Sequence, residues 1–568
     1  MKSLLLDVGS SYIKYSFYDN TSRKNTEVFS VPFPSPVVDD GIRFEVDCNK
    51  IKQALFAIMN EAKAEGCKAV FSCVQMHGYI IRERNFSNYI SWKDKRGAKY
   101  LDKEKVEDLF DNGTAKKVNL PRISLREILS FREKEFFTLG SYIAYLLTGK
   151  NITHITDACA SGLYKVNMKE DNPFDGLMLP SVVGEISPCG KYENMDIYPP
   201  TGDHQISYLG SGATEGDAVL NLGTAAQLSI LESEDCERLC SIEYRPYFEK
   251  GKRVATLSGL VTAESEKLLS RIKSTIDSFM NVKRILISGG GKSKYAFFEK
   301  ELISMGYEVE ICQKNVGNEG LKKLADSVYS LRGTMLSEVE FVNYPFVIKK
   351  AGLDFFIIDN EHGSFENKTI NALALNSRLA DIQAIVRLPN NDRAMITKLA
   401  DGGVNGFLLP MTNSKEDIEK VVEYAKYFPA GKRGISTTRA HTGYGVSNIK
   451  EYMKDANNNM KIYAQIETML GVSNVEEILK VSEVEGVFIG PNDLSCDYNC
   501  IGEVEKIKEL ISTITKTCVK YDKPCGIITT NKDMIAHALL CGCTLICYGS
   551  ELNMIKKGAQ EIKNEKFV

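Results

Sequence analysis

The chain has 568 residues and carries 71 Lys and Arg against 74 Asp and Glu, a formal net charge of −3. The near-neutral charge argues against nucleic acid as a partner. No apolar run reaches the ~18 residues that a membrane span needs. The N-terminal apolar run stops at Asp7, too early for a signal peptide, so we expect a soluble cytoplasmic protein. At about 150 residues per domain, the length predicts about three or four domains.

The 15 cysteines are scattered along the chain and do not form the paired, short-spaced set of a structural zinc site. Free cysteine is among the most buried residue types, and thiols stay reduced in the cytosol. We therefore expect buried, reduced thiols.

The first predicted elements form a hairpin. Apolar strands at 4–8 and 12–18 flank the turn Gly9-Ser10-Ser11, and Asp7 precedes this turn. Backbone N–H groups in such a turn suit a phosphate group, and a carboxylate suits its hydrated magnesium ion. An ordinary hairpin explains the pattern equally well.

Two later apolar strands, at 218–222 and 285–287, also run into glycine-rich turns. These turns contain Gly223, Thr224, Gly289, Gly290 and Gly291. The three strand–turn elements resemble the two phosphate motifs and the adenosine motif of the sugar kinase/actin/Hsp70 ATPase fold.

Further segments resemble the FGGY carbohydrate kinases. They are Gln75–Gly78, Ser91–Arg96, Leu147–Gly149, Asp157–Leu163 and Gly202–Gln205. Gln75–Gly78 and Tyr244–Phe248 are most similar to the sedoheptulokinase-like branch. The resemblance runs in order over about 330 residues. It implies a two-lobed ribonuclease-H-like ATPase domain with lobes at 1–215 and 216–330.

The resemblance also implies roles for these residues. Phosphoryl transfer needs a carboxylate that receives the proton of the attacking hydroxyl, and Asp203 matches the catalytic base of the family. The implied sugar pocket contains Gln75, His77, Trp92 and Asp94. ATP with Mg2+ would bind at Asp7, Gly9, Ser10, Ser11, Gly223, Thr224 and Gly289–Gly291. Outside these motifs, core packing would be the simpler explanation for Trp92 and His77.

The second lobe departs from the family pattern in its length. Only about 60 residues separate Thr224 from Gly289, where the family carries a longer helical subdomain. Lid closure and adenine contacts are therefore in doubt. A catalytically inactive sugar-kinase-like module for binding or assembly stays open as an alternative.

The part from 331 to 568 has a regular pattern of strands and helices. Eight apolar strands are predicted, at 333–336, 353–358, 382–388, 404–409, 461–466, 486–489, 525–528 and 543–548. Amphipathic helices between them, such as 414–427 and 475–481, imply parallel pairing and a (β/α)8 TIM barrel. An open doubly wound sheet is the alternative. A predicted helix at 319–331 runs directly into the first strand, which argues against a flexible linker.

Polar residues follow the predicted barrel strands at their C-terminal ends, where such barrels place catalytic groups. The segments are Asp359–Gly363, Arg387–Pro389, Gln465–Thr468 and Gly490–Ser495. Together with Ala430–Gly434 and Arg439–Tyr444, they resemble the HpcH/HpaI aldolases, the metal-dependent class II pyruvate aldolases.

This resemblance implies that Glu467 and Asp493 hold a divalent cation, Mg2+, Mn2+ or Co2+, as hard oxygen ligands. Arg387 would stabilise the oxyanion of a pyruvate enolate. His362, oriented by Asp359, would assist removal of the 4-hydroxyl proton. Gln465 and Pro491 would contact the substrate. Acyl-CoA lyase chemistry of the citrate-lyase type is the alternative within this superfamily.

Taken together, the two halves predict a bifunctional enzyme. The first activity is ATP-dependent phosphorylation of a sugar, ketose or polyol. The second is reversible cleavage of a 4-hydroxy-2-oxo acid to pyruvate and an aldehyde. We expect small-molecule substrates, no nucleic-acid or membrane partner, and a homo-oligomer. An aldolase that carries the inactive kinase-like module is the alternative.

Overall fold

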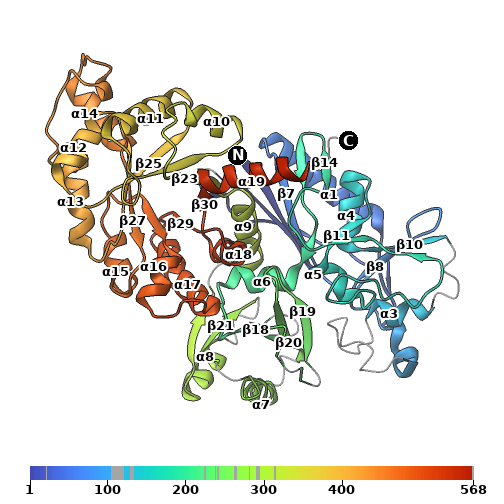
Figure 1. The fold of residues 1–568 in the computed structure, drawn as a ribbon. Helices are drawn as coiled ribbons and strands as arrows, with labels where there is room; N and C mark the ends of the chain where they lie inside the picture. The colour runs from blue at the N-terminus through green and yellow to red at the C-terminus, as the bar shows by residue number, and fades with distance from the viewer. Residues whose placement is uncertain are drawn as a thin grey trace. The chain divides into compact units, whose positions relative to one another are not determined.

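The computed structural model describes residues 1–20, 22–103, 120–127, 133–222, 226–236, 238–239, 242–260, 265–279, 282–289, 295–312 and 315–565. The chain divides into two compact units, Met1–Val328 and Tyr329–Val568. Figure 1 shows the two units in the colours of the chain, and each is described by itself below.

The first unit begins with the predicted hairpin. Strand β1 (Lys2–Val8) pairs antiparallel with β2 (Tyr12–Asp19) and parallel with β7 (Ala69–Val74). The same sheet contains β3 (Lys24–Asn25), β4 (Phe29–Pro32), β14 (Gly190–Tyr192), β15 (Met195–Ile197) and β16 (Thr201–Gly202). Apolar side chains of β1 and β7 pack with those of α1 (Cys48–Ala64) and α4 (Leu139–Thr148) in one buried core.

Two smaller sheets complete this part of the unit. One contains β5 (Val38–Asp39), β6 (Phe44–Val46), β8 (Tyr79–Arg82), β9 (Tyr89–Ile90), β10 (Lys134–Thr138) and β12 (Leu177–Met178). The other pairs β11 (Ile152–His154) with β13 (Ser181–Val183). Short helices lie between these strands: α3 (Pro121–Ser124) and α5 (Ile155–Ala158), with 3-10 turns at Arg96–Lys103, Leu125–Glu127 and Cys159–Ser161. The stretches 19–47 and 167–200, which lack a clear sequence pattern, thus contain short strands.

The six-stranded sheet around β17 (Asp217–Leu222) repeats the central arrangement of the eight-stranded sheet around β1. Strand β17 pairs antiparallel with β18 (Ala226–Ser233) and parallel with β21 (Arg284–Ser288), as β1 does with β2 and β7. Its other strands are β19 (Glu243–Pro246), β20 (Lys252–Leu260) and β22 (Glu308–Ile311). Four helices accompany it: α6 (Asp203–Ser211), α7 (Ser265–Ile276), α8 (Tyr295–Ser304) and α9 (Val316–Val328). Both sheets therefore contain the same hairpin-plus-parallel-strand unit, and the division into lobes at 1–215 and 216–330 stays a prediction.

The second unit is a closed barrel of eight parallel strands, so the predicted (β/α)8 topology is confirmed and the open sheet is wrong. The strands are β23 (Leu331–Leu336), β24 (Phe355–Asp359), β25 (Gln383–Arg387), β26 (Gly406–Leu409), β27 (Lys461–Ile466), β28 (Gly486–Ile489), β29 (Cys525–Ile528) and β30 (Leu545–Ser550). All eight predicted strands are present. The helix predicted at 319–331 ends three residues early, because Leu331 already pairs with Leu545 in the barrel.

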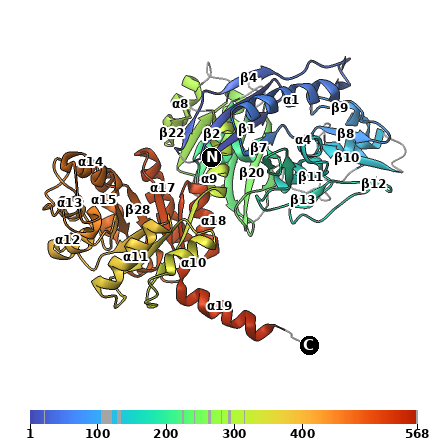
Figure 2. The ribbon, with the colours of Figure 1, turned by 90° about the horizontal axis from the view of Figure 1, so that it is seen from above.

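Helices surround the barrel and bury their apolar faces against its strands. They are α10 (Tyr344–Lys350), α11 (Asn367–Leu379), α12 (Arg393–Asp401), α13 (Lys415–Ala425), α14 (Ile449–Asn459), α15 (Met469–Leu479), α16 (Pro491–Asp497), α17 (Val504–Lys520), α18 (Lys532–Cys541) and α19 (Glu551–Asn564). Two of them differ from the rest. No side chain of α14 is buried, and α19, of which only Glu551 is buried, extends away from the barrel (Figure 2).

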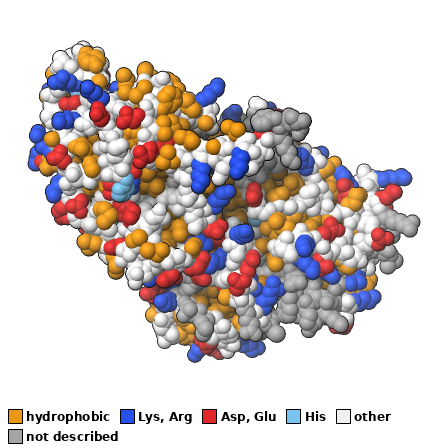
Figure 3. All heavy atoms as spheres, in the orientation of Figure 1, with side chains coloured by type: hydrophobic (Ala, Val, Ile, Leu, Met, Phe, Trp, Pro, Cys, Tyr) orange, Lys and Arg blue, Asp and Glu red, His pale blue; other side chains and the backbone are white. Residues whose placement is uncertain are grey.

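The charged surface and the cysteines have the distribution that the sequence composition predicts. Acidic and basic side chains are interspersed over the face that Figure 3 shows. In the part of the chain that the structure describes, no helix has both the length and the apolar character needed to cross a bilayer. The described cysteines are free thiols and most are buried, although Cys236 and Cys496 are exposed.

Candidate active sites

The barrel brings the predicted aldolase residues to one rim. Asp359 and Arg387 are the last residues of β24 and β25 and stand opposite each other in the register. Glu467 directly follows β27, and Asp493 lies in the first turn of α16, which follows β28. Because parallel strands present their carboxyl ends at the same edge, these groups meet although they are distant in sequence.

Arg387 is held by two carboxylates. Its Nε donates to Asp359 Oδ1 (3.0 Å) and its Nη2 to Asp359 Oδ2 (2.7 Å), and its Nη1 lies 3.2 Å from Glu361 Oε2. Burial opposes ionisation of Asp359, but the hydrogen bonds and charge of Arg387 outweigh it and lower the pKa of Asp359. The guanidinium therefore has a defined orientation, which an oxyanion-stabilising donor requires.

The pairing predicted between Asp359 and the ring of His362 is not the one the structure contains. Asp359 Oδ1 accepts the backbone N–H groups of Glu361 (3.1 Å) and His362 (3.2 Å). The His362 side chain is 73% exposed, and its Nε2 lies 3.9 Å from Glu361 Oε2. The reason is electrostatic: the buried guanidinium of Arg387 occupies both oxygens of Asp359, so Glu361 is the carboxylate nearest the imidazole.

Glu467 is buried at the centre of the rim. Its Oε1 accepts the backbone N–H of Met411 (2.7 Å) and its Oε2 accepts Nε2 of Gln465 (2.5 Å). Burial raises the pKa of Glu467 to about 7, and the negative charges of Asp493 and Glu361 add to the rise. A cluster of carboxylates with this mutual repulsion is stabilised by a bound cation.

The donor set fits a hard divalent cation. Glu467 and Asp493 supply carboxylate oxygens, which such cations prefer, and in the described residues no three His, Cys, Asp or Glu side chains converge on a common metal position. Within the part of the chain that the structure describes, the buried Oε1 of Gln465 has no hydrogen-bond partner, so it can bind a substrate or a water molecule. A Cβ at Gly490 would lie 2.5 Å from Glu467 Oε2, so a larger residue at this position would displace the Glu467 carboxylate. Pro491 is buried in the first turn of α16.

Glu361 is the aldolase-site residue that the sequence analysis did not select. Burial raises its pKa, while Arg387 opposes that rise. Glu361 stood within the quoted segment 359–363, but it lies in a turn, where the alternation of a strand no longer says which way a side chain points.

In the first unit, Asp7 and Asp203 come together through the central sheet. Asp7 and Thr201 both stand beside Cys73, from β1 and β16 on the two sides of β7. Asp203 follows two residues after Thr201 and begins α6. Burial and, to a smaller extent, the charge of Asp7 raise the pKa of Asp203 to about 7, and Arg245 opposes the rise. Burial also raises the pKa of Asp7.

The predicted phosphate turn is an ordered hairpin turn. Gly9 donates its N–H to the carbonyl of Tyr12 (3.0 Å). Ser10 and Ser11 remain partly or fully exposed, so their hydroxyls are accessible. The Gln75 amide donates to the carbonyl of Gly9 (3.4 Å), and its buried Oε1 has no hydrogen-bond partner among the described residues. Gln75 thus links the predicted phosphate turn to the predicted sugar pocket.

His77 is locked in a single tautomer. Its Nδ1 donates to the carbonyl of Ala160 (2.8 Å), so its Nε2 is an acceptor, and Nη2 of Arg245 lies 3.4 Å away. The backbone of His77 is left-handed, with φ +67°, which is unusual for a residue with a side chain. Arg245, which the sequence analysis did not select, is buried and paired with Glu243 (2.5 Å). Its motif, Tyr244–Phe248, was the available signal.

The structure argues against the predicted contact between Asp94 and a sugar. Asp94 is buried, and each of its oxygens already accepts two hydrogen bonds, from Arg96 and from the backbone N–H groups of Arg96 and Phe44. These bonds saturate the carboxylate, so Asp94 holds the loop around Trp92 instead. Trp92 itself is partly exposed.

Most of the predicted ATP residues of the second lobe, Gly223, Thr224, Gly290 and Gly291, lie outside the described residues. Gly289 is described and has φ +105°. A Cβ there would lie 2.5 Å from Asn221 Oδ1, so this turn after β21 requires glycine.

Comparison with known proteins separates the two units. Residues 347–556 match the family described as HpcH/HpaI aldolase/citrate lyase. A 5-keto-4-deoxy-D-glucarate aldolase of Salmonella arizonae is 29% identical over 218 residues, which are 38% of this chain and 84% of that protein. The solved HpcH/HpaI aldolase of Desulfitobacterium hafniense DCB-2 is 31% identical and covers 44% of this chain and 96% of its own, with a TM-score of 0.40.

A solved glycerol kinase of Plasmodium falciparum with ADP covers 57% of this chain and 88% of its own, with 16% identity and a TM-score of 0.49. These comparisons assign a family to the barrel only: residues 347–556 form an HpcH/HpaI aldolase/citrate lyase domain.

Proposed function

We propose that the barrel unit cleaves a 4-hydroxy-2-oxo acid reversibly to pyruvate and an aldehyde. The observation that carries the proposal is the Arg387 guanidinium, held by Asp359 on the same rim as Glu467 and Asp493. A buried, oriented cation beside a pair of hard oxygen ligands suits a reaction that develops negative charge on a 2-oxo acid.

Glu467 and Asp493 would hold the divalent cation, Mg2+, Mn2+ or Co2+, which supplies Lewis-acid chemistry when bound. In the cleavage direction, the 4-hydroxyl loses its proton and the C3–C4 bond breaks. The aldehyde leaves, and the electron pair of that bond forms the enolate of pyruvate. His362, exposed at the rim beside Glu361, assists the proton transfer. Arg387 donates hydrogen bonds to the enolate oxygen, and protonation at C3 then completes pyruvate.

The name of the Salmonella relative supports keto-deoxy sugar acids as the first substrates to test. The experiment follows pyruvate release from such acids with Mg2+, Mn2+ or Co2+, for the unchanged chain and for Asp493→Asn. Metal-dependent pyruvate release that the substitution reduces supports the proposal. Acyl-CoA cleavage with no aldol activity would favour the citrate-lyase alternative.

For the first unit we propose ATP-dependent phosphorylation of a sugar, ketose or polyol. The observation that supports it is Asp203, whose pKa near 7 suits a group that takes up a proton at neutral pH. Asp203 would accept the proton of the attacking hydroxyl, and Asp7 would hold the hydrated Mg2+ of ATP.

The test is sugar-dependent ADP release over a panel of ketoses, aldoses and polyols, with Asp203→Asn as the control. Release that depends on Asp203 supports the kinase. Sugar binding without ADP release would favour the inactive binding or assembly module, which the short segment between Thr224 and Gly289 makes the second candidate.

Homo-oligomerisation and a cytoplasmic location stay predictions. Helix α19, which extends from the barrel, exposes Leu552, Ile555 and Ile562. We propose that a second copy of this chain covers these side chains, because exposed apolar clusters of this kind mark interaction surfaces. Sedimentation of the unchanged chain and of Ile555→Asp tests this: an unchanged mass would remove α19 from the interface.

A further inference from the structure

A cavity of about 810 Å³ lies at the end of the barrel opposite the candidate aldolase site. Met460 directly precedes β27, Glu485 directly precedes β28 and Glu483 lies two residues before Glu485, so this part of the lining lies at the N-terminal ends of the two strands. Six residues of β27, about 20 Å of strand, separate this end from Glu467. The cavity is therefore a separate feature from the catalytic rim.

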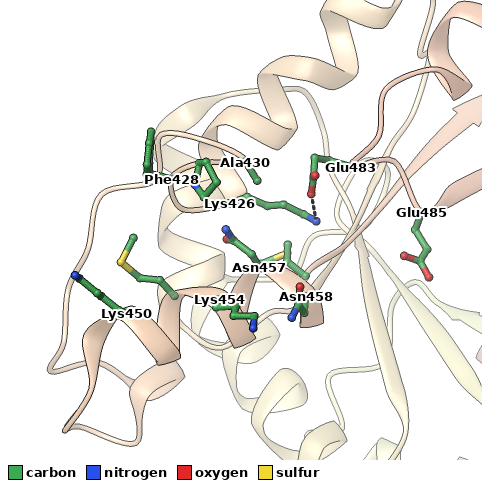
Figure 4. A pocket seen from close by; sticks show the side chains of 12 residues that line it. Lys426, Phe428, Ala430, Lys450, Lys454, Asn457, Asn458, Glu483 and Glu485 are labelled. Carbon is green, nitrogen blue, oxygen red and sulfur yellow. Dashed lines mark hydrogen bonds and ion pairs between the residues drawn. The ribbon is translucent and has the colours of Figure 1, made fainter.

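The walls of the cavity are built by fixed contacts. The Asn457 amide on α14 donates to the carbonyl of Tyr427 (2.8 Å) and accepts the backbone N–H of Tyr427 (2.7 Å). Lys426, which is buried, pairs with Glu483 at 2.6 Å, as the dashed line in Figure 4 marks. These contacts attach the segment 426–430 to α14 and to the start of β28.

The charges of the lining do not balance. Glu483 is neutralised by Lys426, and Glu485 by Lys461 (2.9 Å). Lys450 and Lys454 stand one turn apart on α14 and have no ion-pair partner in the described part of the chain. The lining thus has three lysines against two glutamates, and because Lys461, from outside the lining, neutralises Glu485, neither Lys450 nor Lys454 is balanced by a glutamate of the lining. In Figure 4, Lys450 lies at its edge, on a side chain long enough to turn inward.

Apart from Asn457 and Asn458, the rest of the lining is apolar. Phe428 is 78% exposed, although its neighbour Tyr427 is buried, and Pro429, Met453 and Met460 line the same cavity. An exposed phenylalanine beside unpaired lysines offers a flat apolar surface next to positive charge. A volume of about 810 Å³ also lies within the range of small-molecule sites.

We propose that this cavity binds a small organic phosphate, with the phosphate at Lys450 and Lys454 and the organic body against Phe428. Phosphate suits two ammonium groups because it carries close to two negative charges near neutral pH. Either a nucleotide or a sugar phosphate provides this chemistry. The site is non-catalytic, and the proposal does not depend on the activity of either unit.

Because Trp92 is the only tryptophan of the chain, the site can be given its own reporter. In the full chain, Trp92→Phe combined with Phe428→Trp leaves one indole, at the cavity. Its emission is titrated with ATP, ADP, glucose 6-phosphate and inorganic phosphate at constant ionic strength, since salt screens exposed charges.

We expect a saturable change with at least one organic phosphate, and affinity about tenfold weaker after Lys450→Gln with Lys454→Gln. The matched control replaces Lys415 and Lys420, two exposed lysines of α13, by Gln and should leave the affinity unchanged. A response to the nucleotides or to the sugar phosphate identifies the source of the ligand.

Three results would overturn the proposal. They are the absence of a saturable change with every probe, equal affinity in the Lys450/Lys454 variant, and inorganic phosphate binding as tightly as the organic phosphates. The last would show that the aromatic side chain at position 428 contributes nothing to binding. Because all the substituted lysines are exposed, thermal unfolding of the variants should match that of the reporter protein.

Discussion

Replacing Arg387 by Lys tests the centre of the proposed aldolase mechanism. Lysine keeps the positive charge, so the carboxylates of Asp359 and Glu361 are not left without a counter-charge. Removing the charge altogether would cost about 3–5 kcal/mol of stability, the usual effect of breaking a buried ion pair. What lysine loses is the fork that makes two contacts with Asp359, at 3.0 and 2.7 Å, and one with Glu361 at 3.2 Å.

The expected loss follows from that geometry. A lysine can donate to Asp359 or to the substrate oxyanion, but it cannot hold a second donor in a defined direction toward the substrate. Loss of one oriented oxyanion donor costs about 2.7–4 kcal/mol, a decrease in kcat of about 10²–10³-fold. The chain should stay folded, with a thermal unfolding midpoint close to that of the unchanged protein.

Two assays with the chosen divalent cation present measure this effect. Aldol cleavage and oxaloacetate decarboxylation both form the enolate of pyruvate, so kcat should fall in parallel in both. Arg393→Lys, at an exposed position on α12, is the matched control and should change neither rate. If folded Arg387→Lys loses less than about threefold in both assays, Arg387 is not the oxyanion donor and the proposed mechanism fails.

Three further predictions test other parts of the two sites. His362→Ala should slow aldol cleavage by about 10²-fold but spare oxaloacetate decarboxylation, which has no 4-hydroxyl proton to remove; equal losses in both would contradict a role in proton transfer. Asp203 acts as a base only when ionised, so kinase kcat/KM should fall as the pH drops below about 7. Arg245→Gln removes a positive charge that lowers the pKa of Asp203, so it should move this fall in kcat/KM to higher pH, whereas Arg245→Lys, which keeps the charge, should not. An unchanged pH profile in Arg245→Gln would refute Asp203 as the catalytic base. Gly490→Ala places a Cβ against Glu467 Oε2 and should weaken divalent-metal affinity about 10–100-fold, measured by calorimetry; unchanged affinity would show that Glu467 is not a metal ligand.

Much of the barrel could be predicted from sequence because its signals are local. All eight strands are short apolar runs. Because the strands pair in parallel, the polar residues at their C-terminal ends lie on one rim of the barrel. The end of α9 could not be predicted in the same way. Helical spacing continues through residue 331, but pairing of Leu331 with Leu545, more than 200 residues away, ends the helix earlier.

For the two candidate sites as well, some features could be predicted from sequence and others could not. The sequence by itself determined which residue types stand at the strand ends: Glu467 after β27, Arg387 at the end of β25, and Asp7 at the end of β1. Only the tertiary structure decided which groups pair. It gave both oxygens of Asp359 to Arg387 rather than to His362.

The same holds for the groups that sequence analysis passed over or placed elsewhere. Both carboxylate oxygens of Asp94 already accept hydrogen bonds from Arg96, so Asp94 is not available to bind a sugar. Arg245, in contrast, lies close enough to Asp203 to lower its pKa. The physical reason is that a side chain's type is written at its own position, but its hydrogen-bond partners, its burial and therefore its pKa depend on what other segments bring to it. Those partners come from strands and loops distant in sequence, and only folding selects among them.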